Sequence, residues 1–490
     1  MNAPALPFDN SYARLPARFY ARLDPTPVRE PGLLRVNRPL CAALGIDADW
    51  LASEAGVAMV AGNAVPEGAE PLATAYAGHQ FGQYNPQLGD GRALLLGELL
   101  DSDGRRFDIQ LKGSGPTPWS RGGDGRSPLG PVLREYLVSE GMYALGVPTT
   151  RALAAVTTGE RVMRDGIEPG AVLARVASSH IRVGTFQYFA VRGDREALET
   201  LLGHVIERHY PQARDAANPA LAVLEGVIAR QAGLIASWQH LGFIHGVMNT
   251  DNMLLCGETV DYGPCAFMEA FHPETVFSSI DHGGRYAYQN QPGIAHWNLV
   301  RFAETLLPLL HADQDEAIAL AQEALGAFPR LFSEAHAAGL ARKLGLKALR
   351  PDDDELVEGL FAALAEDGAD FTLAFRHLSE FDGPDARAFE GLFQPGNALA
   401  AWLPRWRERL AADDDDPAAR RARQRAANPV FIPRNHLVQA TIEAAEGGDL
   451  APFHRLAARV ADPWTWDPAD VDLARPARPE EQVRRTFCGT

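Results

Sequence analysis

Three side chains in one short stretch of the chain have the chemistry to bind a metal ion and to accept a proton. Asp251 and Asn252 are adjacent in the segment HGVMNTDNM, and Asp261 follows in the triplet DYG. Carboxylate and amide oxygens are ligands of Mg²⁺, which in nucleotide sites also binds phosphate oxygens. A second carboxylate beside such an ion could act as a general base. The stretch therefore predicts acid–base chemistry next to a metal-bound substrate.

The spacing of this stretch is similar to that of the catalytic loop of protein kinases, with one replacement. In the kinase pattern a His precedes the catalytic Asp by two positions and a metal-binding Asn by seven. His245 and Asn252 keep the second spacing, but Val247 occupies the position of the base and cannot accept a proton. We interpret the segment as a site that keeps its metal ligands, Asn252 and Asp261, while the base has moved to Asp251.

One lysine on a predicted strand supplies a cation for phosphate. Only three of the 46 basic residues are lysines, and Lys112 ends the alternating run RFDIQLKG, which is typical of a strand. In kinases such a Lys contacts phosphate and is held by a Glu from the following helix. The helix predicted from Pro131 to Gly146 offers Glu135, which we expect to orient Lys112; the alternative is an exposed helix face. Lys343 and Lys347 are four residues apart, which predicts a solvated face.

Two Gly-rich turns could bind phosphate through their backbone amides. Gly89 and Gly91 have the G-x-G spacing and are followed by Arg92, and a second GDGR contains Asp124 and Gly125. Glycines let backbone amides approach an anion, and Arg adds bidentate contacts. The alternative for the first copy is the tight turn of a hairpin, because the third glycine of a phosphate-covering loop is missing.

The predicted elements divide the chain into a strand-rich part and a helical part. Residues 1–70 look like a wrapping arm, and residues 71–190 contain strand-like runs interrupted by one helix. Residues 191–330 carry helices and the catalytic loop, and residues 331–490 form a helical C-terminal extension. In MLLCGETVDYGP, two apolar runs around CGE predict a hairpin that delivers Asp261. This order predicts an α+β, protein-kinase-like fold with a strand-rich small lobe and a helical large lobe.

Composition and charge argue against several other classes. The net charge of -17 speaks against a nucleic-acid partner, and we interpret RRARQR, which follows DDDD, as a solvated, self-neutralising segment. There is no run of eighteen apolar residues and no hydrophobic signal segment, so we expect no membrane partner and a cytoplasmic location. The four cysteines are too scattered for a disulfide framework. Walker and G-x-S-x-G motifs are also absent from the sequence.

Longer segments of the chain resemble the selenoprotein O (SelO, also YdiU) family of protein adenylyltransferases. The resemblance runs from about residue 72 to residue 310 and is carried by YAGHQFGQYNPQLGDGRALLLGE, DIQLKGSGPTPWSRGGDGRSPLGPVLREYLVSEGMYALGVPTTRAL, HGVMNTDNM and DYGPCAFMEAF. It implies a pseudokinase fold that binds ATP in a flipped orientation. The implied reaction transfers AMP to Ser, Thr or Tyr hydroxyls of proteins, self-modification included, and releases pyrophosphate.

The resemblance also implies roles for individual residues. Asp251 takes the position of the catalytic base, and Asn252 and Asp261 take the positions of the Mg²⁺ or Mn²⁺ ligands. Without the resemblance, the two arginines in LARVASSHIRVG would be read as surface residues. The implied ATP contacts are Gly89, Gly91, Arg92, Lys112, Asp124, Gly125, Arg175, Arg182 and Asp261.

Two cysteines suggest a redox link. Some family members carry a Cys-x-x-selenocysteine motif near the C-terminus, whereas this chain has Cys488 in TFCGT without a partner three residues away. A disulfide between Cys265 and Cys488 would tie the tail across the segment after DYG and gate activity by oxidation. The alternative is a loose tail with an unremarkable thiol.

Two other functions stay open at this point. One is a kinase that transfers the γ-phosphate with a displaced base, and the other is a non-catalytic ATP-binding scaffold. Val247 argues against the first, and the retained Asn252 and Asp261 argue against the second.

Overall fold

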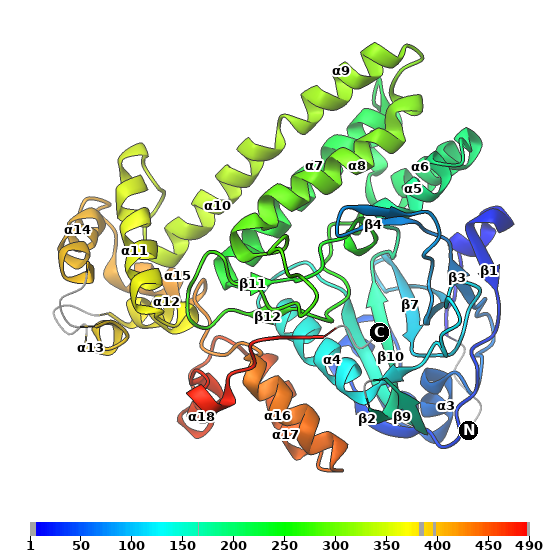
Figure 1. Cartoon of the computed structure of the whole chain (residues 1–490), viewed down its shortest axis with the longest axis horizontal. Helices are drawn as coiled ribbons and strands as arrows, with labels where there is room; N and C mark the ends of the chain where they lie inside the picture. The colour runs from blue at the N-terminus through cyan, green and yellow to red at the C-terminus, as the bar shows by residue number, and fades with distance from the viewer. Residues whose placement is uncertain (1–5, 165, 382–386, 395–397, 488–490) are drawn as a thin grey trace.

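Strands occupy the first part of the chain and helices dominate the rest (Figure 1). The structure is a computed structural model that describes residues 6–164, 166–381, 387–394 and 398–487. The predicted mixed α/β composition, with strands early and helices late, is confirmed.

An antiparallel sheet forms the centre of the strand-rich part. Its strand order is β1-β3-β6-β7-β10-β9-β2, and β8 pairs with β10. The strands are β1 (Tyr20–Arg22), β2 (Gly32–Val36), β3 (Leu72–Thr74), β6 (Ala93–Leu100), β7 (Arg106–Lys112), β8 (Ser127–Pro128), β9 (Arg151–Met163) and β10 (Ile167–Ala177).

Both outer strands of this sheet come from the predicted N-terminal arm. Strand β1 pairs with β3 at one edge, and β2 pairs with β9 at the other, where Leu33 lies opposite Val156. One stretch of chain therefore closes both edges of the sheet.

Helices cover the two faces of the sheet. Alternate residues of β10 face opposite sides: Val172 and Val176 join the core under the short helices α1 (Arg38–Ala43), α2 (Ala48–Leu51) and α3 (Glu54–Ala61). Leu173 joins the core under α4 (Leu129–Ala144), which the later helices α16 (Asn435–Glu446) and α17 (Ala451–Val460) also contact. Both later helices belong to the predicted helical extension, residues 331–490, and they pack on α4.

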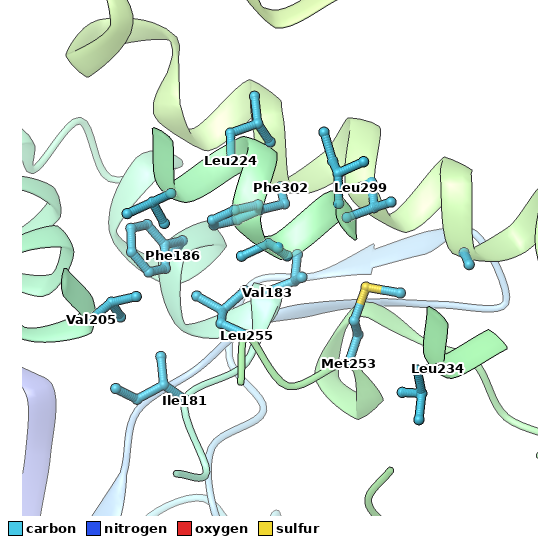
Figure 2. Packing of buried hydrophobic residues seen from close by; sticks show 14 of the residues in the cluster. Ile181, Val183, Phe186, Val205, Leu224, Leu234, Met253, Leu255, Leu299 and Phe302 are labelled. Carbon is cyan, nitrogen blue, oxygen red and sulfur yellow. The ribbon is translucent and has the colours of Figure 1, made fainter. Parts of the chain in front are cut away.

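The helical part is built around α7 (Pro219–Leu241). Apolar side chains of α5 and α8, such as Phe186 and Phe302, meet Leu224 of α7 in one buried cluster, and their rings contact edge to face (Figure 2). The neighbouring helices are α5 (Val183–Ala190), α6 (Arg195–His209), α8 (Gln291–Leu310), α9 (Gln314–Leu325) and α10 (Phe328–Leu344).

Helix α7 is also the one helix, among the described residues, that is long and apolar enough to cross a membrane by length and composition alone. It packs against α8 and α10, and Val223 and Val227 lie in the core. The core helix of a globular protein meets the same criterion, so α7 is weak evidence for a membrane segment.

The extension shares a second core with the preceding helical part. Most of its side chains come from α10 to α14 and include Phe371 and Trp406, and residues 244, 268, 271 and 288 of the preceding part complete it. Lys343 of α10 is buried in this core, so the predicted solvated face is wrong for this residue, although Lys347 is exposed. The helices of the extension are α11 (Asp354–Asp367), α12 (Phe371–Glu380), α13 (Arg387–Glu390), α14 (Leu399–Ala411), α15 (Pro417–Arg425) and α18 (Val471–Ala474).

The predicted hairpin before Asp261 is not formed. Leu254 bridges to Arg182, and Thr259 bridges to Thr149, so the two apolar runs pair with different neighbours. Each run forms one isolated bridge with a segment outside the predicted hairpin, and Leu255 and Cys256 lie in a turn.

Candidate functional site

A cleft of about 660 Å³ lies between the inner strands of the sheet and the catalytic loop, which we define as residues 245–252. It brings together residues from the strand-rich part and from the helical part. The sequence-predicted residues that line it are Gly89, Gly91, Arg92, Lys112, Asp124, Gly125, Glu135, Arg175, Arg182, Asp251, Asn252 and Asp261, so none of the predicted set lies elsewhere.

Two cations at the inner end of the cleft share two carboxylates. Lys112 Nζ donates to Glu135 Oε2 at 2.6 Å and to Asp261 Oδ1 at 2.8 Å. Arg175 Nη1 donates to the same Asp261 oxygen at 2.7 Å and to Glu135 Oε1 at 3.1 Å. All four residues are largely or fully enclosed, and Glu135 is only 3% exposed, so this is a buried network rather than a surface one.

The neighbouring strands β7 and β10 hold these cations side by side. Arg175 lies directly opposite Gln110 in the register, and Gln110 Oε1 accepts a hydrogen bond from Arg175 Nε at 2.7 Å. Lys112 stands two residues beyond Gln110 on the same face of β7. The pleat of the sheet thus directs both cations into the cleft.

This network keeps its carboxylates ionised. Burial by itself would raise the pKa of Asp261, but Arg175, Lys112 and Arg182 outweigh burial and hold that pKa well below its usual range. For Glu135 burial likewise opposes Lys112 and Arg175, and the net pKa is lowered. Both acids are anions at neutral pH.

Arg182 connects the network to the catalytic loop. Its Nη1 donates to the backbone oxygen of Asp251 at 2.7 Å and to Asp261 Oδ2 at 3.2 Å. The guanidinium carbon lies 4.5 Å from the centre of the Tyr76 ring. The side chain is therefore fixed from three sides, although a strand-and-turn interpretation of its sequence would place it on the surface.

Asp251 is a buried carboxylate with one oxygen left open. Gln80 Nε2 donates to its Oδ2 at 3.3 Å, while Oδ1 has no hydrogen-bond partner among the described residues. Burial raises the pKa of Asp251 to about 6, and the charge of Arg182 opposes this rise. A carboxylate with a pKa near neutrality and a free oxygen has the properties of a general base.

A short hairpin, which sequence reasoning missed, packs on the catalytic loop. Strands β4 (Gly78–Gln80) and β5 (Gln83–Asn85) form it, and the amide of His79 donates to Thr250 Oγ1 at 2.7 Å. A Cβ on Gly78 would lie 2.6 Å from Asp251 Oδ1, closer than real Cβ contacts come. The only signal in the sequence is Gly78 itself, because no local pattern shows that this residue packs against Asp251.

Asn252 and Asp261 both line the cleft, and each carries an oxygen of a type that binds a metal ion. Asn252 Nδ2 donates to the backbone oxygen of Val247 at 2.9 Å, so its amide oxygen is the atom left for a ligand. Asp261 adopts a left-handed conformation with φ of 63°, which is uncommon for a non-glycine residue and is often found at functional sites. The described residues contain no cluster of three His, Cys, Asp or Glu side chains for a metal. One carboxylate and one amide fit Mg²⁺, which usually completes its shell with phosphate oxygens and water.

The first Gly-rich turn packs against Trp119. A Cβ on Gly89 would lie 2.2 Å from the Trp119 side chain, and one on Gly91 would lie 2.9 Å from the Trp119 backbone oxygen. The two glycines connect β5 to β6, which belong to different sheets, so they are not at the tip of a hairpin.

The second Gly-rich turn forms the outer rim of the cleft. Asp124 pairs with Arg164 at 2.9 Å and is partly exposed, and it accepts a hydrogen bond from the Arg126 amide at 2.9 Å. Gly125 has a φ of 64° and approaches the backbone oxygen of Gly115, where a Cβ would lie at 2.0 Å. Glycine is therefore required at this turn.

The predicted Cys265–Cys488 link lies partly outside the described residues, because Cys488 does. Cys265 is buried. Close by, Thr486 Oγ1 donates to the backbone oxygen of Pro264 at 2.6 Å, so the end of the described chain passes beside Cys265.

Comparison with known proteins adds to this geometry. The family model described as "Protein adenylyltransferase SelO" matches residues 3–461. A protein nucleotidyltransferase YdiU of Rhodopseudomonas palustris (strain BisB5) is 60% identical over 487 residues, which are 99% of each chain. Proteins of the same name from Alkalilimnicola ehrlichii and Rhizobium etli (strain CIAT 652) are 58% and 56% identical, covering 99% of this chain and 99% and 98% of theirs. With these matches over nearly its whole length, the chain belongs to the SelO family.

Proposed function

We propose that the chain is a protein adenylyltransferase: it transfers AMP from ATP to Ser, Thr or Tyr hydroxyls of proteins. The fold that we propose for it is kinase-like, with residues 71–190 as the small lobe and residues 191–330 as the large lobe. Residues 1–70 would be the arm that closes the sheet, and residues 331–490 the extension.

The observation that carries this proposal is the position of Asp251. Its carboxylate is buried in the cleft, has an open oxygen, and directly precedes Asn252. Val247, at the base position of the kinase pattern, has no group that accepts a proton. A base placed here favours a reaction that differs from γ-phosphate transfer.

In the proposed reaction the acceptor hydroxyl gives its proton to Asp251 as its oxygen attacks the α-phosphorus of ATP. A new oxygen–phosphorus bond forms, the bond between the α-phosphorus and the bridging oxygen breaks, and pyrophosphate leaves with that electron pair. Negative charge grows on the phosphorus oxygens and on the pyrophosphate. Preorganised cations that face such charge contribute most of the rate enhancement in many enzymes.

The cations of the cleft suit an inward-pointing triphosphate. Arg175 and Arg182 are each 2% exposed, and Lys112 is 7% exposed, so the positive charge is concentrated at the closed end. This distribution supports ATP bound with its triphosphate turned inward, with further contacts from Arg92 and the two Gly-rich turns.

Asn252 and Asp261 are the residues that we propose to hold Mg²⁺ or Mn²⁺. The ion would supply positive charge for the triphosphate when it is bound. The chain's own contribution is to orient these two ligands: Val247 fixes the Asn252 amide, while Lys112, Arg175 and Arg182 fix the Asp261 carboxylate.

Label transfer from ATP tests the proposal. Casein and the chain itself are incubated as acceptors with ATP labelled at the α- or at the γ-phosphate, with magnesium or manganese and a reductant. We expect protein to be labelled from the α-position only. Label from the γ-position would make the protein a kinase with a displaced base, and ATP binding without any label would favour a scaffold.

Two variants assign the residues. Asp251→Asn is expected to bind ATP as tightly as the wild type and to transfer AMP at least 100-fold more slowly, as is typical when a general base is lost. Asp261→Ala is expected to lose both transfer and metal-dependent ATP binding. If Asp251→Asn transfers AMP at the wild-type rate, the assignment of the base is wrong.

A further inference from the structure

A second cavity of about 630 Å³ adjoins the proposed nucleotide cleft. Pro131, Arg164 and Ile280 line both cavities, so the two are continuous. Two segments form one wall of the second cavity: residues 278–280, which follow DYG, and residues 483–487 of the tail, drawn in red in Figure 1.

The tail is held against the first of these segments by backbone hydrogen bonds. Ser278 and Thr486 form a parallel bridge, in which the Thr486 amide donates to the Phe277 oxygen at 2.8 Å and the Ser279 amide donates to the Thr486 oxygen at 3.0 Å. Asn435 Nδ2 donates to the Val483 oxygen at 3.1 Å. The wall is therefore a fixed part of the fold.

Two exposed apolar side chains line this cavity: Ile280 and Phe487 are 56% and 64% exposed. Met163 and Ile167, which pair across the β9–β10 turn, are 65% and 63% exposed and directly precede two lining residues, Arg164 and Glu168. These four belong to the ten large hydrophobic residues of the described chain that are exposed. Exposed apolar side chains beside a cavity are typical of sites that bind another molecule.

Polar groups in the cavity also lack partners. Ser278 is 5% exposed, and its hydroxyl has no hydrogen-bond partner among the described residues. Glu168 of β10 and Glu446 of α16 line the opposite side and form no ion pair within the described part of the chain. They lie close enough that, after burial, the charge of Glu168 contributes to raising the pKa of Glu446.

The remaining cations of the cavity are distributed unevenly. Arg164 is paired with Asp124, and Arg134 is held by Asn435 Oδ1 at 2.8 Å. The charge of Glu168 also contributes to raising the pKa of Arg164, after Asp124. Arg485 lines the cavity from the tail. A bound chain would meet acidic groups on the α16 side and apolar side chains on the rim.

We propose that this cavity docks the acceptor protein through an extended segment with an apolar side chain for the rim of Ile280 and Phe487 and a basic side chain for Glu168 and Glu446. The segment would continue into the nucleotide cleft, where its hydroxyl reaches Asp251. Continuity with the cleft, the apolar rim and the two unpaired glutamates support this occupant. The role as an acceptor site rests on the proposed adenylyltransferase activity.

Binding and transfer are measured separately to test the docking site. The affinity of fluorescently labelled casein is measured by anisotropy in the Asp251→Asn background, and kcat and KM for casein are measured in the wild-type background. Phe487→Asp and Glu446→Lys, which lie outside the nucleotide cleft, should each weaken casein binding and raise KM at least fivefold. The affinity for ATP should change less than twofold, and Val191→Asp, an exposed apolar residue elsewhere, should change nothing.

Other results would overturn the proposal. Unchanged casein binding in both variants would exclude this surface as the docking site. If deletion of residues 488–490 raises casein affinity fivefold or more, the chain's own end occupies the cavity. If Phe487→Asp dissociates a dimer in sedimentation, a second copy of the chain occupies it. Loss of casein binding in the variants, with no label from α-labelled ATP in the wild type, would leave the docking site standing and refute the proposed reaction instead.

Discussion

Replacing Lys343 by Met should stabilise the extension. The Lys343 side chain is 2% exposed, and its Nζ lies 4.2 Å and 5.4 Å from the ring centres of Phe375 and Phe371. It forms no ion pair with a carboxylate of the described chain. Burial lowers the pKa of Lys343 from the ordinary value of 10.5 to about 7.

This pKa sets the size and the sign of the effect. One pKa unit corresponds to about 1.4 kcal/mol, so the shift corresponds to at most about 5 kcal/mol of lost stability. The contacts with the two rings recover about 0.5–2 kcal/mol of it. Because the pKa of Lys343 is lower in the folded state, the unfolded state binds more protons between pH 7 and 10.5. The cost is therefore fully present below pH 7 and fades as the pH rises.

Lys343→Met keeps the length of the side chain and removes the charge, so we expect it to stabilise the extension by about 2–4 kcal/mol at pH 7. Hydrogen exchange of α10 and α12 peptides is the appropriate assay, because a chain of this size need not unfold in one step. The wild type should gain about 2 kcal/mol between pH 7 and 9, and the variant should not. Lys347→Met, four residues away and exposed, is the control. Equal protection of wild type and Lys343→Met at pH 7 would refute the reasoning.

Three other substitutions probe the site and its supports. Gly78→Ala should lower the AMP-transfer rate tenfold or more and change ATP affinity less than twofold, because the added Cβ displaces Asp251. Gly203→Ala, where an added Cβ meets nothing within 4 Å, should leave the transfer rate unchanged in the same kinetic assay. Glu135→Gln removes the charge that two buried cations share, so thermal unfolding should reveal a loss of about 3–5 kcal/mol. Arg434 is fully buried and pairs with two carboxylates, so Arg434→Met should lower the free energy of unfolding in urea by a similar amount. A loss below 1 kcal/mol in Glu135→Gln or Arg434→Met would contradict the stabilising role of that residue's buried ion pairs.

The residues of the candidate site could be predicted because their order along the chain is itself informative. A Lys at the end of a strand, a Glu early in the next helix, and the Asn and Asp after His245 each have weak meaning alone. Together they predict a shared cleft, and the structure places Lys112, Glu135 and Asp261 in contact there. Helix α4 could be predicted because Pro131 and Gly146 are local start and stop signals that do not depend on distant contacts.

The parts that could not be predicted depend on approaches between distant segments. Gly78 touches Asp251, and the amide of His79 meets Thr250, across 171 residues of sequence. The two lysines of α10 share a local pattern, yet Lys343 is buried by Phe371 and Phe375 of a later helix. The expected hairpin is absent, and Thr259 instead bridges to Thr149, which lies 110 residues earlier in the chain. Local sequence patterns indicate which side chains share a face of a helix or strand. Contacts with distant segments determine which of those faces is buried.

The closure of the sheet by one N-terminal stretch has a consequence for synthesis. Strand β2 cannot pair until β9 exists, because Leu33 bonds opposite Val156, more than a hundred residues later. At roughly 5–20 residues per second, the strand waits on the order of 5–25 s as an unpaired edge on the nascent chain. During that time its backbone can pair with any exposed strand nearby. This edge of the sheet is therefore completed only after β9 has been synthesised.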